Sequence, residues 1–240
     1  MKNVTIHEGI VCIDKPKGIS SFKALSVFRR CYDIERDVKL GHAGTLDPRA
    51  TGLLVVGVGK GTKELRHIVG LDKRYEATML LGISTDSADL DGVVKEKKDT
   101  SSLDGENIKK NLLSLVGTHR IPIPAFSAMK YKGKRLYAHA REGRETPVIP
   151  RDMTVYAVEN ISCETVPYSS LSTEQIDEKD DISAVLVRCN FHVESGVYIR
   201  SLAEELGRRL SVPGTLAELR RTHVGEYALD GSYSLDDCII

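Results

Sequence analysis

The sequence contains no tryptophan, and only 5% of its 240 residues are aromatic. This scarcity argues against a glycoside hydrolase with an aromatic sugar cleft, a class that also requires two carboxylates at a defined separation. No uncharged apolar run approaches the roughly 20 residues that span a bilayer, and the N-terminus lacks the apolar segment of a secretory signal. The protein is therefore expected in the cytoplasm, without a membrane partner.

The sequence also lacks a net charge, because 34 basic residues balance 34 acidic ones. Overall charge therefore does not indicate a nucleic-acid partner, and an RNA-binding surface would have to come from local segregation of charge. No CxxC pair suggests a zinc or redox site. The five cysteines are expected to be reduced and mostly to pack in the interior; they are Cys12, Cys31, Cys163, Cys189 and Cys238.

The spacing of apolar residues predicts a mixed α+β protein. Alternating or continuous apolar runs predict strands at residues 9–13, 53–58, 75–81 and 185–193. Helical spacing is found at residues 21–32, 61–70, 108–115 and 199–210. Strands do not alternate strictly with helices, which disfavours a doubly wound parallel sheet, and no linker is evident, so residues 1–240 are expected to form one domain. Two polar segments, 95–107 and 165–181, are predicted to be surface loops.

The segment richest in unusual residues is 40–54, with the sequence LGHAGTLDPRATGLL. Its three glycines allow backbone conformations closed to other residues, and Pro48 fixes the chain after Asp47, so the carboxylate should lie on a rigid loop. Two interpretations stay open from the residues alone. Asp47 could cap backbone amides in a structural turn, or the loop could hold a functional group.

GHAGTLDPRATG resembles the catalytic-loop motif of the TruB family of tRNA pseudouridine synthases. Five further stretches resemble the family's other motifs in the same order: DKPKGISS, KRYEATMLLG, TDSADLDG, FSAMKYKGKRLYAHAREG and GVYIRSLAEELG. Several motifs in family order are far more specific than one Gly-rich pattern. The resemblance covers nearly the whole chain and implies the pseudouridine synthase fold, a mostly antiparallel mixed sheet flanked by helices, with a thumb-like insertion at residues 122–151.

The resemblance implies isomerisation of uridine to pseudouridine at position 55 in the T-loop of tRNA. The nucleotide is flipped out, uracil is detached from its ribose, and the base is rejoined through C5, with neither a metal nor an organic cofactor. Asp47 is the implied catalytic residue, since a carboxylate can act on the sugar as a nucleophile or as a base. A covalent sugar adduct and a glycal intermediate both stay open.

The same resemblance assigns roles to four more residues. Arg200 of the YIR motif is placed against the catalytic carboxylate, and Tyr75 stacks on the target uracil and serves proton transfer at C5. His42 enters the RNA stack that the flipped nucleotide leaves. Asp89 is an active-site neighbour that binds substrate; a calcium loop around it is disfavoured because the closing Glu of an EF-hand is missing.

Basic and aromatic residues are interleaved within the insertion, as suits phosphate neutralisation and base stacking. From charge alone, a solvated basic face is the alternative. The resemblance implies that the insertion grips the T-arm, with Lys130, Tyr131 and Arg135 binding substrate. Lys15 of the DKP motif is expected to support the catalytic loop or a nearby phosphate.

Many bacterial members of the family continue into a small C-terminal RNA-binding PUA module, and the printed sequence ends at SYSLDDCII, where that module would begin. A catalytic domain without this module is therefore expected, acting on tRNA as a monomer with no obligate protein partner. The alternative is a tRNA chaperone of the same fold, which would not need Asp47. The presence of Asp47, Tyr75 and Arg200 argues for the enzyme.

Overall fold

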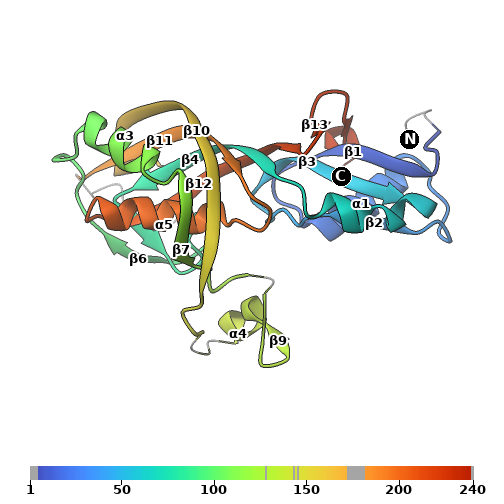
Figure 1. Cartoon of the computed structure of the whole chain (residues 1–240), viewed down its shortest axis with the longest axis horizontal. Helices are drawn as coiled ribbons and strands as arrows, with labels where there is room; N and C mark the ends of the chain where they lie inside the picture. The colour runs from blue at the N-terminus through green and yellow to red at the C-terminus, as the bar shows by residue number, and fades with distance from the viewer. Residues whose placement is uncertain (1–4, 128, 143, 145, 172–181, 239–240) are drawn as a thin grey trace. The chain divides into compact units, whose positions relative to one another are not determined.

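A computed structural model of the chain describes residues 5–127, 129–142, 144, 146–171 and 182–238. The chain divides into two compact units (Figure 1). Unit 1 takes residues 1–76, 192–195 and 218–240, and unit 2 takes residues 77–191 and 196–217. Three strands contribute residues to both units: β4 (Lys73–Leu81), β11 (Ser183–Val193) and β12 (Gly214–Val224). That residues 1–240 form a single domain, as expected from the sequence, stays a prediction.

The sheet of unit 1 has the order β14-β1-β3-β12, with β2 also on β3 and β13 on β12. Its remaining strands are β1 (Gly9–Lys15), β2 (Leu40–Ala43), β3 (Thr51–Val58), β13 (Tyr227–Ala228) and β14 (Tyr233–Ser234). β1 and β2 both run antiparallel to β3, whereas β12 is parallel to it. The sheet is therefore mixed, as expected.

Strand β3 is apolar along most of its length because both of its faces are covered. Leu54 and Val56 pack with residues of α1 (Ser21–Cys31), while Leu53 and Val55 face a second cluster. That cluster includes Ile68 of α2 (Leu65–Ile68), which follows the short 3-10 helix η1 (Gly59–Lys63). Helix α1 begins as predicted, since the Ser20 side chain accepts a hydrogen bond from the Lys23 amide at 3.1 Å.

The sheet of unit 2 has the order β4-β11-β10-β7, in which β7 (Gly117–Pro122) runs antiparallel to the long strand β10 (Pro150–Pro167). Two small antiparallel sheets join β5 (Ile83–Thr85) to β6 (Val94–Lys97) and β8 (Lys130–Tyr131) to β9 (Lys134–Arg135). The helices are α3 (Gly105–Leu113), α4 (Leu136–Arg141) and α5 (Ile199–Arg209), followed in the chain by η3 (Asp236–Cys238) of unit 1.

Helix α5 buries Ile199, Leu202 and Leu206, the stripe that its sequence predicts. In Figure 1, α5 lies beside the strands of unit 2, and α4 with β9 projects away from that sheet. Together the two units confirm the α+β class and the mostly antiparallel sheet. No helix in the described ranges has both the length and the apolar character to cross a membrane.

Two predicted loops are partly wrong. Residues 95–107 include most of β6 and the start of α3, because β6 pairs with β5 and the Asp104 side chain caps the Asn107 amide at 3.1 Å. Residues 165–181 begin with the end of β10 and the 3-10 helix η2 (Tyr168–Ser170). Tyr168 is fully buried, and its hydroxyl donates to the carbonyls of Gly82 and Lys98. Residues 172–181 lie outside the described residues.

Two further corrections concern residues 40–54 and the cysteines. The unusual segment is not a loop throughout, since β2 covers its start and β3 its end. The expectation that all five cysteines are reduced is wrong for Cys31 and Cys238, which form a disulfide. This pairing could not be predicted from the spacing of the cysteines, because the two residues are 207 positions apart in the chain. Cys12, Cys163 and Cys189 are free, and only Cys189 of these is buried.

Candidate active site

Asp47 lies on the loop between β2 and β3, and the backbone on both sides of it is tied down. Before it, the Ser21 hydroxyl donates to the Leu46 carbonyl at 2.9 Å and accepts from the Leu46 amide at 2.8 Å. After it, the Lys15 ammonium donates to the Pro48 carbonyl at 3.2 Å. The loop that carries the half-buried Asp47 is therefore held by side chains from β1 and α1.

Lys15 is fully buried under this loop. Its ammonium also donates to the carbonyls of Pro16 at 2.9 Å and Ile19 at 2.8 Å. Burial lowers the pKa of Lys15 to about 8, and the nearby Asp47 charge opposes that shift. Three carbonyl acceptors around an enclosed ammonium favour the loop-supporting role over a direct phosphate contact.

Arg221 of β12 is a further residue of this site, one that none of the sequence motifs indicated. Its fully buried guanidinium donates to the Leu53 carbonyl at 2.8 Å and the Gly44 carbonyl at 3.0 Å, so it joins the two ends of the Asp47 loop. Gly52 completes the fit: its φ is +98°, and a Cβ there would lie 2.3 Å from the Arg221 carbonyl oxygen. The residues of β12 could not have revealed these contacts, because the two carbonyls belong to residues 168 and 177 positions away in the chain.

His42 lies on strand β2, paired with Val56, rather than on the loop itself. The ring is half-buried, and among the described residues its Nδ1 atom has no hydrogen-bond partner. Burial and, after it, the Arg221 charge lower the pKa of His42. A neutral, flat ring with an unused polar atom suits a place in a base stack.

Tyr75 is buried on the same face of β4 as Lys73 and Ala77. The Lys73 ammonium donates to the Val69 carbonyl and to the Ser195 hydroxyl, both at 2.7 Å. Burial is the main cause that lowers the pKa of Lys73 to about 8. Tyr75 is thus presented by a strand whose start is fixed by a buried ammonium.

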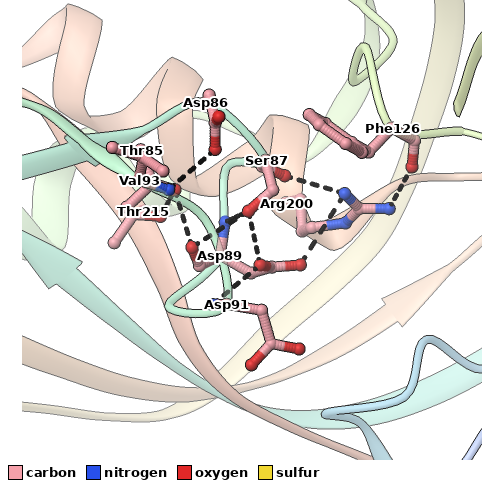
Figure 2. Close-up of polar contacts among 9 residues, drawn as sticks. All are labelled: Thr85, Asp86, Ser87, Asp89, Asp91, Val93, Phe126, Arg200 and Thr215. Atoms are coloured by element: carbon pink, nitrogen blue, oxygen red, sulfur yellow. Dashed lines mark hydrogen bonds and ion pairs between the residues drawn. The ribbon is translucent and has the colours of Figure 1, made fainter. Parts of the chain in front are cut away.

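Arg200 lies in the first turn of helix α5 in unit 2, and its guanidinium is buried between three acceptors (Figure 2). It donates to the Ser87 carbonyl at 2.7 Å and to the Phe126 carbonyl at 2.8 Å, and it lies 3.7 Å from an Asp89 carboxylate oxygen. A buried ion pair needs such additional hydrogen bonds to offset its desolvation. Asp47 belongs to unit 1 and Arg200 to unit 2. The Asp47–Arg200 contact that the TruB motifs imply therefore stays a prediction.

The Asp89 carboxylate is engaged within its own turn. The Ser87 hydroxyl donates to it at 2.6 Å and the Asp91 amide at 3.1 Å. Burial raises the pKa of Asp89, while the Ser87 hydrogen bond and the Arg200 charge lower it. These contacts agree with the turn that was preferred over a calcium loop.

The three predicted RNA-gripping residues lie on one two-stranded hairpin in unit 2. Lys130 and Tyr131 form β8, and Arg135 lies on β9. Both cations are exposed, and the half-buried Tyr131 ring contacts the His139 ring edge-on, with centroids 6.1 Å apart. The structure therefore presents two exposed basic side chains on the hairpin that carries Tyr131, and the ammonium of a further lysine, Lys132, lies 5.3 Å from the centre of the Tyr131 ring.

Comparison with known proteins shows the family to which the chain belongs. Residues 29–199 match the TruB family pseudouridylate synthase (N terminal domain). The chain belongs to the TruB family. Its enzyme class is therefore pseudouridine synthase, an isomerase. Relatives of this TruB-family chain include tRNA pseudouridine synthase B of Corynebacterium efficiens, 37% identical over 99% of the chain and 74% of that protein.

A second relative, tRNA pseudouridine synthase B of Thermobifida fusca, is 38% identical over 96% of the chain and 74% of its own length. Solved structures share the fold. The Cbf5-Nop10-Gar1 complex contains a chain that matches with a TM-score of 0.64 at 24% identity, over 95% of this chain. The TruB-family chain spans about half of that larger protein, 53% of its length.

Proposed function

We propose that this TruB-family chain isomerises uridine to pseudouridine at position 55 in the T-loop of tRNA. The relatives named tRNA pseudouridine synthase B support the substrate. The observation that carries the proposal is the loop of Asp47, whose backbone is held on both sides by Ser21 and Lys15. A carboxylate on such a fixed loop can meet the anomeric carbon of a flipped nucleotide without first being ordered.

In this reaction Asp47 acts on the ribose, either as a nucleophile at C1′ or as the base that removes the C2′ proton. Tyr75 stacks on the uracil and transfers the C5 proton, while His42 occupies the place left by the flipped base. Arg200 orients and stabilises the Asp47 charge, with Asp89 as its buried partner. For each of these residues the role is carried over from the TruB motifs and is part of the proposal.

The hairpin of β8 and β9 binds the T-arm in this scheme. Lys130 and Arg135 neutralise phosphates, and Tyr131 offers its ring to a base. The chain acts without an obligate protein partner, as a monomer in the cytoplasm. Lys15 contributes indirectly, because its ammonium is used by carbonyls of the loop.

Tritium release from tRNA labelled at uracil C5 tests this function. The label leaves for water when C5 forms its new bond to C1′. We expect release from the natural chain, and none from Asp47→Asn, which keeps the shape of the side chain but removes its charge. Asp37→Asn, a matched change at an exposed aspartate, should release tritium at the natural rate.

Two controls separate the outcomes. A transcript with cytidine at position 55 should yield no release, and filter binding should show that Asp47→Asn still holds tRNA. If the natural chain binds tRNA without releasing tritium, the chaperone alternative accounts better for the protein. Release that persists without uridine 55 would place the target elsewhere in the RNA.

A further inference from the structure

The turn that joins β5 to β6 carries an unusual set of buried polar contacts (Figure 2). The Thr85 hydroxyl donates to the Asp89 carbonyl at 2.6 Å and lies 3.3 Å from the Thr215 hydroxyl of β12. The Leu216 amide donates to the Ala88 carbonyl at 3.0 Å. The turn is therefore fixed to β12 by backbone and side-chain hydrogen bonds.

Ser87 is the residue of this turn that contacts both members of the Arg200–Asp89 pair. Its hydroxyl donates to the Asp89 carboxylate at 2.6 Å, and its carbonyl accepts from the Arg200 guanidinium at 2.7 Å. Ser87 is only 8% exposed, so water competes little for either bond. One buried serine thus fixes the carboxylate with its side chain and the guanidinium with its backbone.

The turn also leaves room for this hydroxyl. A Cβ at Gly92 would lie 2.3 Å from the Ser87 hydroxyl oxygen and 2.4 Å from an Asp86 carboxylate oxygen. The same Asp86 oxygen accepts from the Val93 amide at 2.9 Å and closes the turn behind Ser87. Glycine at position 92 is therefore required for Ser87 to keep its place.

We propose that Ser87 is a positioning residue for uridine isomerisation, which holds the Asp89 carboxylate ionised and oriented so that Arg200 is aimed correctly. The inference rests on the proposed function. A hydroxyl that donates to a carboxylate forms a strong, charge-assisted hydrogen bond. Without it, the Asp89 carboxylate keeps the hydrogen bond from the Asp91 amide and the ion pair with Arg200 at 3.7 Å, while the Asp91 charge disfavours ionisation.

Kinetics of three variants test the proposal. Ser87→Ala should lower kcat about tenfold, the effect of one hydrogen bond to a charged group, with KM nearly unchanged. In a plot of kcat against pH, the acid limb of Ser87→Ala should lie at higher pH than that of the natural chain. The reason is that the pKa of Asp89 rises when a hydrogen-bond donor to its ionised form is removed. Ser87→Thr, which keeps the hydroxyl, should restore most of kcat. Ser84→Ala, a change at a half-buried serine of β5, should have no effect.

A double-mutant cycle separates positioning from a general loss of structure. In an Asp89→Asn background, Ser87→Ala should cause no further fall in kcat. Equal falls in both backgrounds, or an unchanged pH profile for Ser87→Ala, would overturn the proposal. Thermal unfolding of each variant shows whether a fall in kcat comes from unfolded protein.

A measurement without RNA keeps this inference apart from the proposed function. Carbon-13 NMR of labelled aspartate carboxyls, with Asp89 assigned through Asp89→Asn, should show a higher Asp89 pKa in Ser87→Ala. An unchanged titration would refute the role of Ser87 whatever uridine is modified. Absence of pseudouridine formation by the natural chain, with the expected titration, would count against the proposed function alone.

Discussion

The position of the Asp47 carboxylate depends on neighbouring side chains that hold its loop and have no proposed part in the reaction itself. Ser21, Lys15 and Arg221 all form hydrogen bonds with backbone carbonyls or amides of the loop. Since a misplacement of about 1 Å can cost a hundredfold in rate, these supports matter for turnover as well as stability. They also explain why buried cations surround a loop whose own side chains are mostly small.

Ser21→Ala tests one of these supports. The change leaves the Leu46 amide and carbonyl without their side-chain partner in a buried place, which should lower the free energy of unfolding by about 1–3 kcal/mol. We expect kcat to fall more than KM rises, because Asp47 loses its fixed position. Urea denaturation and tritium release measure the two effects.

Ser26→Ala is the matched control for this variant. Ser26 lies on the same helix, is exposed, and bonds only weakly to the Phe22 carbonyl at 3.4 Å. Its loss should leave both stability and kcat near their natural values. If the two alanine variants behaved alike, the contacts with Leu46 would not be what holds the loop.

At the scale of elements, the β8–β9 hairpin is small but concentrates the predicted contacts with RNA. The strands have two residues each and the whole protein has no net charge. Attraction of tRNA must therefore come from local cations, whose effect falls steeply with salt. Lys130 and Arg135 are the cations that we propose for this role.

The double variant Lys130→Ala, Arg135→Ala should weaken tRNA binding and flatten its salt dependence. The slope of log affinity against log salt should fall by about one for each phosphate that the variant no longer neutralises. Filter binding over a range of salt concentrations measures it. Lys109→Ala with Lys110→Ala, two exposed lysines on α3, is the control of equal charge. Equal slopes for the two double variants would exclude a special role for the hairpin.

At the scale of the whole molecule, the two units are not separate along the chain. Each is assembled from at least two stretches, and β4, β11 and β12 give residues to both. Unfolding one unit would remove the ends of strands that the other uses. This sharing favours cooperative unfolding of the whole chain.

The absence of tryptophan makes that cooperativity easy to measure. Tyr227→Trp places a fluorescent reporter in unit 1, and Tyr156→Trp places one in unit 2. Both reporters, and far-UV circular dichroism, should give the same denaturation midpoint. Midpoints that differ between the reporters would show that the units unfold independently, and the expectation of one domain would then be wrong.

The sequence by itself determined α1 and α5, because burial of one helix face requires their regular apolar spacing, and β3, because burial of both strand faces requires a continuous apolar run. Its motifs also determined the TruB family and the residues proposed for catalysis. Only the tertiary structure decided which polar groups support them. Arg221 reaches Gly44 across 177 positions and Arg200 reaches Ser87 across 113. Such bonds leave no periodic trace in the chain, since each partner is chosen by folding and not by its neighbours in sequence.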